Sequence, residues 1–181
     1  MIETARSAED IKKHAADLYW LAFLLTERQD LSIEIASDTA VSGDYASPFF
    51  TDWMRGWQRR LVIGRALSAI HAELADSAGR TELARVHGST PRKWLLGPDT
   101  TKADLEQALL AIDLFPRAAL LLLVFEGIRM ADAATLLDAN PALIRKAQAI
   151  GLRELTARLA GTSRKARKEP CFWLRTTAAC H

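Results

Sequence analysis

Residues 126–159 read EGIRMADAATLLDANPALIRKAQAIGLRELTARL and carry the clearest helical pattern in the chain. The first part has apolar residues at the i, i+3, i+4 and i+7 positions of one face, namely Met130, Ala133, Ala134 and Leu137. Asn140 is a favourable N-cap, and Pro141 follows at the first helical position, where its missing N–H is not needed. The pattern predicts two helices joined by a tight turn.

The second helix of this pair has two different faces. We expect one face to be buried; it carries Ile144, Ala147, Gly151 and Leu155. The opposite face carries Ala142, Arg145, Lys146, Ala149 and Arg153. Small residues in the first helix, and Asp138 in the turn, which tolerates a left-handed backbone, are typical of a helix-turn-helix that reads the major groove of DNA. The alternative is an ordinary helix pair of a bundle, because alanine-rich pairs are common.

The composition is that of a soluble protein with a core. The 181 residues are 49% hydrophobic and 25% charged, with a net charge of +2. The charge is unevenly spread: residues 1–80 carry 9 basic and 12 acidic side chains, whereas residues 161–181 carry 5 and 1. Any contact with nucleic acid must therefore use local basic faces.

The sequence does not predict insertion into a membrane. The polar start MIETARSAEDIKKH does not resemble a signal peptide, and the longest apolar runs, 18–25 and 118–125, are too short to span a bilayer. Cys171 and Cys180 alone do not suggest a disulfide framework. We expect a cytoplasmic protein.

The first forty residues predict two helices. The first opens at Ser7 and has an apolar stripe that includes Leu18 and Leu25. After a polar break, residues 31–42 form the second, whose outer surface is acidic, with Asp30, Glu34 and Asp38. The alternative interpretation of these acids is a solvated face without a partner.

A long helix is expected from about Phe49 to Leu74. One side of this helix carries Trp53, Trp57, Leu61, Gly64, Leu67 and His71, and we expect His71 to be packed and hydrogen bonded. Arg55, Arg59 and Val62 should face away, with Gln58 and Arg65 on a flank. Basic and aromatic residues in alternation suit single-stranded or distorted nucleic acid. Tryptophans in the core and arginines in water are the alternative.

Glycine and proline residues interrupt the helical pattern in residues 75–100. This stretch is therefore predicted to be a linker with at most a short helix around residues 82–86. Helical pattern resumes after Thr101, and Pro116 is expected to open a deeply buried helix, RAALLLLVFEG, that Gly127 ends. Residues beyond Ala160 are expected to be disordered. The predicted fold is all-α, with two small helical domains joined by a linker.

In this order, the elements resemble a bacterial RNA polymerase sigma factor of the extracytoplasmic-function (ECF) type. Residues 108–155, ALLAIDLFPRAALLLLVFEGIRMADAATLLDANPALIRKAQAIGLREL, resemble the family's C-terminal domain. Residues 25–41, LTERQDLSIEIASDTAV, resemble its polymerase-binding helix, and residues 53–66, WMRGWQRRLVIGRA, resemble the helix that faces the −10 promoter element. The chain departs from the family where Asp132-Ala133-Ala134 replaces the usual Glu-Ile-Ala and where Asp138 replaces the turn glycine.

The resemblance implies a domain plan. Residues 1–78 would form a sigma region 2-like domain for core polymerase and the −10 element, and residues 79–100 a linker. Residues 101–160 would form a region 4-like helix-turn-helix domain for the −35 element, followed by a basic tail at 161–181. The expected partners are core RNA polymerase and promoter DNA, with an anti-sigma factor as a further candidate.

The resemblance also implies roles for single residues. Contacts to polymerase would come from Asp30, Glu34 and Asp38, and the receiving loop for a flipped base would contain Tyr45, Phe49 and Phe50. DNA contacts would come from Arg55, Arg59, Arg65, Asn140, Arg145, Lys146 and Arg153.

No catalysis, metal or cofactor is expected, because the sequence has no nucleophile–base pair, phosphate loop or metal-spaced His/Cys set. The family's usual Ala-Arg-Asn patch is not recognisable in residues 53–66, which leaves a competing hypothesis open. In it, a sigma-like protein no longer reads promoters and acts through protein partners, for instance by titrating an anti-sigma factor. A third alternative, an unrelated all-helical enzyme, would require a group of polar residues inside the core, and the sequence does not indicate one.

Overall fold

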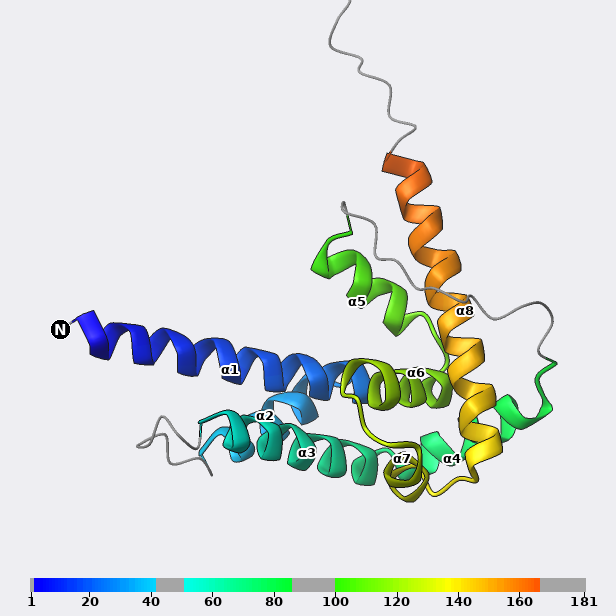
Figure 1. The fold of residues 1–181 in the computed structure, drawn as a ribbon, viewed down its shortest axis with the longest axis horizontal. Helices are drawn as coiled ribbons and strands as arrows, with labels where there is room; N and C mark the ends of the chain where they lie inside the picture. The colour runs from blue at the N-terminus through cyan, green and yellow to red at the C-terminus, as the bar shows by residue number, and fades with distance from the viewer. Residues whose placement is uncertain (1, 42–50, 86–99, 167–181) are drawn as a thin grey trace, which may run out of the picture.

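The protein is entirely helical over the residues that the computed structural model describes, which are 2–41, 51–85 and 100–166 (Figure 1). Eight α-helices and one π-helix follow one another, and these ranges contain no strand. The all-α prediction is confirmed. We refer below to residues 2–85 as the N-terminal half and to residues 100–166 as the C-terminal half.

Three helices pack against one another at the start of the N-terminal half: α1 (Ile2–Thr26), α2 (Gln29–Val41) and α3 (Thr51–Ala69). Helices α1 and α3 run side by side in Figure 1. Leu18 and Leu25, which were expected on the buried stripe of α1, are fully buried. The chain turns between α1 and α2 at Glu27, whose φ of 58° is in the left-handed region.

The long helix predicted over residues 49–74 is divided in two. Helix α3 ends at Ala69, and α4 (His71–Leu83) starts after Ile70, whose φ of −113° departs from helical geometry. Helix α4 buries Leu74, Ser77 and Thr81. It therefore extends through residues 79–83, which we had expected to belong to the linker.

The C-terminal half begins with a capped helix. In α5 (Lys102–Leu110), Thr101 and Asp104 form a capping box, with the Asp104 amide donating to Thr101 Oγ1 at 3.1 Å and the Thr101 amide to Asp104 Oδ2 at 3.0 Å. Hydrogen bonds to the Asp104 carboxylate from the Thr101 hydroxyl, at 2.6 Å, and from the Thr101 amide lower the pKa of Asp104. The next helix, α6 (Leu114–Leu120), continues into the π-helix η2 (Leu121–Phe125).

Helix α6 is the most deeply buried element. Every residue from Phe115 to Leu120 is buried, as the run of leucines predicted. The helix starts at Leu114 rather than at Pro116, because Asp113 caps it, and the proline is tolerated in the first turn, where amides lack helical partners. Gly127, with φ of +62°, ends the segment as expected.

The helix pair predicted over residues 130–159 is present as α7 (Met130–Leu136) and α8 (Pro141–Ala166). Asp138 adopts a left-handed φ of 46°, and the Leu143 amide donates to Asn140 Oδ1 at 2.8 Å, so that Asn140 caps α8. The four residues expected on the inner face are buried: Ile144, Ala147, Gly151 and Leu155. The use of this pair as a DNA reader stays a prediction.

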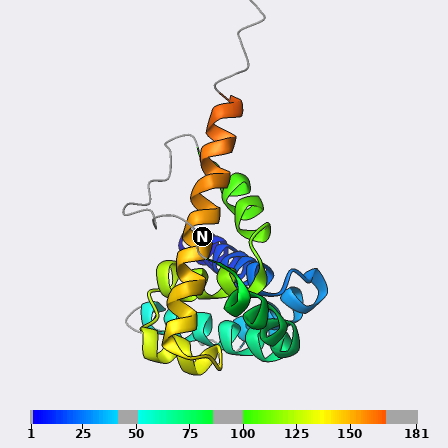
Figure 2. The same ribbon diagram turned by 90° about the vertical axis from the view of Figure 1, so that its right-hand side faces the viewer.

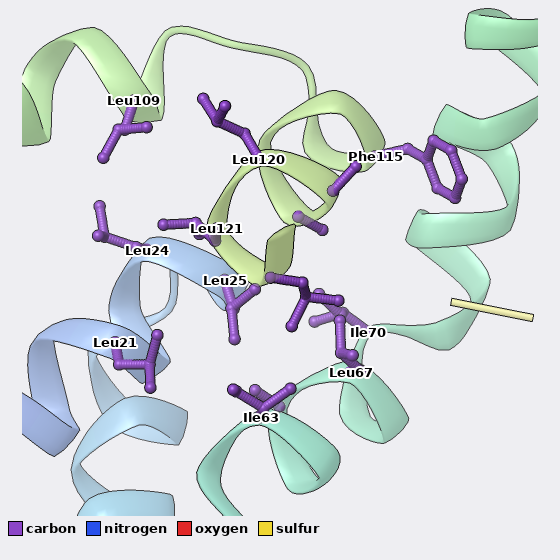
Figure 3. Close-up of a cluster of buried hydrophobic side chains, with 14 of the residues drawn as sticks. Leu21, Leu24, Leu25, Ile63, Leu67, Ile70, Leu109, Phe115, Leu120 and Leu121 are labelled. Atoms are coloured by element: carbon purple, nitrogen blue, oxygen red, sulfur yellow. The ribbon is translucent and has the colours of Figure 1, made fainter. Parts of the chain in front are cut away.

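The two halves share one buried cluster of apolar side chains. Figure 3 shows Leu21, Leu24 and Leu25 of α1 on one side of Leu120 and Leu121, with Ile63 and Leu67 of α3 nearby. Helix α6 contacts α1, α4 and α8. The division into domains at residues 78 and 101 stays a prediction, and the helices on either side of it are in contact.

Helices α6 and α8 cross so closely that residue 151 has no space for a side chain. A methyl group on Gly151 would lie 2.9 Å from the main-chain oxygen of Pro116 and 3.4 Å from Cβ of Leu120. The backbone oxygen cannot move away without shifting α6. Gly151 is therefore required by packing, as its place on the predicted buried face suggested.

We predict that Gly151→Ala destabilises the protein. Overpacking costs about 1–3 kcal/mol, and the better helix propensity of alanine returns up to about 1 kcal/mol, so a net loss near 1 kcal/mol is expected in urea unfolding. Gly56→Ala is the matched control, because Gly56 is exposed within α3 and nothing lies within 4 Å of an added methyl group. Equal or higher stability of Gly151→Ala would contradict the tight crossing.

Candidate nucleic-acid interface

The buried side of α3 is not the one that we predicted. Val62, expected to face away from the tryptophans, is fully buried. Trp53 and Trp57, for which a core position was one of two alternatives, are 64% and 37% exposed. His71 is also exposed. The helix instead buries a stripe that begins at a polar residue, Gln58. A choice of face based on the large aromatic residues was therefore wrong.

Gln58 belongs to the buried face because its amide is fully used. Its Nε2 donates to the main-chain oxygen of Thr39 at 3.0 Å, and its Oε1 lies 2.7 Å from Nε2 of His14. The side chain thus joins α3 to both α1 and α2. Because a buried amide is tolerated when it is hydrogen bonded, this glutamine replaces an apolar residue in the stripe.

Arg59 is paired with a residue of the C-terminal half. Its Nε donates to Glu126 Oε2 at 2.8 Å, and its Nη2 donates to Glu126 Oε1. The hydrogen bond with Glu126 raises the pKa of Arg59, and the effect of burial is in the opposite direction. The guanidinium predicted to hold DNA phosphates is thus engaged by a carboxylate in this structure.

The other basic residues predicted on α3 have different surroundings. Arg55 is partly buried, and its Nε finds no hydrogen-bond partner among the described residues. Arg65 is exposed, and its Nη1 lies 3.7 Å from Oδ2 of Asp38, one of the three acids predicted to bind polymerase. The predicted base-capture residues, Tyr45, Phe49 and Phe50, lie outside the described residues.

The solvent face of α3 carries a basic residue that the sequence reasoning missed. Arg60 is exposed, three residues after Trp57 and seven after Trp53, so these side chains share one face. Their i, i+4, i+7 spacing was the signal that could have identified the face. Beside it, a cleft of about 840 Å³ runs between α3 and α7, and its lining includes Arg59, Arg60 and Arg129.

The four predicted DNA-contact residues of α8 and its cap are not equivalent. Arg145 is exposed near the start of the helix, whereas Lys146 is partly buried and its Nζ donates to the main-chain oxygen of Glu82 at 2.6 Å. Arg153 is also partly buried. The side-chain oxygen of Asn140 is used in the cap. Of the three basic residues, Arg145 is therefore the most accessible to solvent.

The acidic face predicted on α2 is exposed. Asp30, Glu34 and Asp38 are all accessible, and Ile33, which is 56% exposed, lies among them. Asp30 is 4.0 Å from Arg28, at the limit of an ion pair. An apolar side chain surrounded by carboxylates is a surface that a basic protein partner fits better than DNA does.

An exposed ion pair connects α4 to the start of α6. Arg80 donates to both carboxylate oxygens of Asp113, at 3.0 and 2.7 Å, and Asp113 also accepts from the Leu114 amide at 2.9 Å. Burial acts to raise the pKa of Asp113, but hydrogen bonds from Arg80, Leu114 and Ser77 outweigh it, so that the pKa is lowered.

Comparisons of the chain with protein-family models, with curated proteins and with solved structures found no match. Within the described ranges, no helix is long and apolar enough to cross a membrane. The same ranges hold no group of three or more His, Cys, Asp or Glu residues arranged for a metal ion. The geometry of the helices and their charges therefore carries the functional argument.

We predict that Asp113 makes stability depend on acidic pH. A carboxylate with a depressed pKa contributes stability above its unfolded pKa, near 4, and this contribution is lost as the pH falls through the folded pKa. Asp113→Asn keeps a favourable N-cap residue but cannot titrate. The variant should be less stable than the parent at pH 7, and the difference should shrink below about pH 4 in urea unfolding. A difference that is constant with pH would contradict the assignment.

Proposed function

We propose that the protein is a cytoplasmic, sigma factor-like transcription initiation protein that binds core RNA polymerase and directs it to promoter DNA. The observation that carries the proposal is the α7–α8 pair. It combines a short first helix, a turn with left-handed Asp138, an Asn140 cap and an exposed Arg145 at the start of a long second helix. These are features of a helix-turn-helix, in which the first residues of the second helix contact base edges.

The surface of α8 has the chemistry that duplex DNA requires. Ala142 is exposed next to Arg145 and is small enough to permit contact with a thymine methyl group, whereas an arginine pairs with two acceptors of guanine. The opposite face of α8 is packed on α6 through Gly151, which fixes the direction of the helix. Under this proposal, residues 101–160 read the −35 element.

The N-terminal half would contact polymerase and the −10 element. Helix α2 offers exposed carboxylates to the polymerase, and α3 offers Trp53, Trp57 and Arg60 on a single face. Exposed rings stack on unpaired bases, and a guanidinium binds the backbone beside them. Arg60 is a better candidate on this face than Arg59, which is paired with Glu126. Neither catalysis nor a cofactor is needed.

Two observations favour the alternative that the protein acts only through protein partners. Arg59 and Lys146 are both engaged within the chain, and large apolar side chains such as Ile33 and Trp53 are exposed. An exposed aromatic or aliphatic residue surrounded by charges is common in protein interfaces. A sigma-like protein that titrates an anti-sigma factor would use such a surface without reading DNA.

The two functions are separated by transcription with the purified full chain. We expect that the chain co-purifies with core polymerase and supports run-off transcripts from genomic fragments. Polymerase binding without promoter-specific transcripts would favour the protein-partner alternative. Binding to neither polymerase nor DNA would exclude the sigma-like function.

We predict that Arg145→Ala weakens binding to a duplex selected by the full chain from a randomised pool. Loss of a bidentate contact to guanine costs about 1–3 kcal/mol and relaxes the preference at one base pair. Arg28→Ala is the charge-matched control, because Arg28 is exposed at the distant α1–α2 turn. Fluorescence anisotropy measures both variants. If Arg145→Ala binds as the control does, α8 does not read DNA through this residue.

We predict that the double variant Glu34→Lys, Asp38→Lys loses most of its association with core polymerase while its helix content is unchanged, because both side chains are in solvent. Glu73→Lys is the control, because it also replaces an exposed acidic side chain by a basic one, at a position in α4. A pull-down on immobilised core polymerase compares them. Equal retention of all three proteins would show that Glu34 and Asp38 do not contact the polymerase.

A further inference from the structure

Two of the cations predicted to contact DNA are held by groups from the opposite half of the chain. Arg59 of the N-terminal half is bound by both carboxylate oxygens of Glu126 in the C-terminal half. Lys146 of the C-terminal half donates to the main-chain oxygen of Glu82 in the N-terminal half. The paired residues are 67 and 64 positions apart, so local sequence does not explain either contact.

The acceptor of Lys146 is the last turn of α4. Main-chain oxygens at the end of a helix lack helical partners and carry partial negative charge, so they attract an ammonium group as a phosphate does. The Arg80–Asp113 ion pair holds this turn against the start of α6. Figure 2 shows α4 near the lower part of α8. Lys146 belongs to the second turn of α8.

The acceptor of Arg59 is better shielded from water. The Glu126 side chain is 10% exposed and that of Arg59 is 33% exposed, so screening by solvent is reduced. Both Nε and Nη2 of the guanidinium are used by the carboxylate. Glu126 therefore occupies one of the two edges with which an arginine forms bidentate contacts to phosphates, and it offsets the charge of the guanidinium.

We propose that these contacts form a closed state, in which each half holds one candidate DNA-binding cation of the other. DNA then competes with Glu126 for Arg59 and with the last turn of α4 for Lys146. This regulation rests on the proposed function, because it concerns the same cations. DNA binds through each cation only in the fraction of molecules in which that cation is released. The apparent affinity for DNA is therefore the intrinsic affinity multiplied by this fraction. No large separation of the halves is needed. Breaking the Arg59–Glu126 ion pair releases one cation, and moving the end of α4 away from Lys146 releases the other.

Two substitutions open the closed state at different places. Glu126→Gln weakens the hold on Arg59, and Asp113→Asn releases Arg80 and loosens the last turn of α4, while asparagine keeps the cap of α6. Glu73→Gln is the matched control, because it removes one negative charge from an exposed position of α4. Binding of the full-length variants to a fluorescent duplex of randomised sequence is measured by anisotropy across a range of salt.

We expect both opening variants to bind more tightly than Glu73→Gln, by up to about five-fold, which corresponds to about 1 kcal/mol for one released cation. Each newly available cation should also steepen the dependence of log K on log salt by about 0.9. The gain from Glu126→Gln should vanish in an Arg59→Ala background, and the gain from Asp113→Asn in a Lys146→Ala background. Because Asp113→Asn keeps its cap, it tests the proposal even where Glu126→Gln unfolds.

The outcomes separate this inference from the proposed function. If the parent binds duplex and both opening variants match Glu73→Gln, the closed state is overturned and DNA binding stands. Gains that persist in the Arg59→Ala and Lys146→Ala backgrounds also overturn it, because the released cations would not be the cause. If the parent and every variant fail to bind duplex, the proposed function fails, and the inference fails with it.

Discussion

The structure depends on the burial of α6. Every residue of α6 from Phe115 to Leu120 is buried, so the helix must be covered on every side, and no single neighbour can do this. Helices α1 and α4 of the N-terminal half contact it, as does α8 of the C-terminal half. Arg117 strengthens the requirement: its side chain is fully buried, its Nη1 donates to the main-chain oxygens of Leu110 and Ile112 at 3.2 Å, and Nη2 lies 2.5 Å from Glu27 Oε1. A buried guanidinium is stable only with such partners.

This shared core determines where the charged residues meet. Because α4 and α8 both cover α6, the end of α4 lies beside the start of α8, and Lys146 reaches Glu82. The turn after η2 approaches α3, which places Glu126 opposite Arg59. Two of the candidate DNA contacts, Arg59 and Lys146, therefore lie where the two halves meet. This coincidence is the physical basis of the closed state.

Local chemistry made much of the fold predictable. Residues 126–159 indicated Gly127 as a terminator, Asp138 as a left-handed residue and Asn140 as a cap, and all three have these roles. The buried face of α3 was predicted wrongly, because Trp53 and Trp57 suggested one stripe, whereas Gln58 completes the other through hydrogen bonds to distant residues. The pairs Arg59–Glu126 and Arg80–Asp113 follow from tertiary packing, and no pattern within one helix indicates them. The polymerase and DNA contacts stay predictions.

The shared core is tested most directly by native-state hydrogen exchange in Leu120→Ala. Leu120 is fully buried in α6, so its truncation should cost about 2–5 kcal/mol. If α6 supports both halves, the slowest-exchanging amides of α1 in the N-terminal half and of α8 in the C-terminal half should lose protection by the same free energy. Loss of protection in α8 with unchanged protection in α1 would contradict the account, because the halves would then be separate folding units.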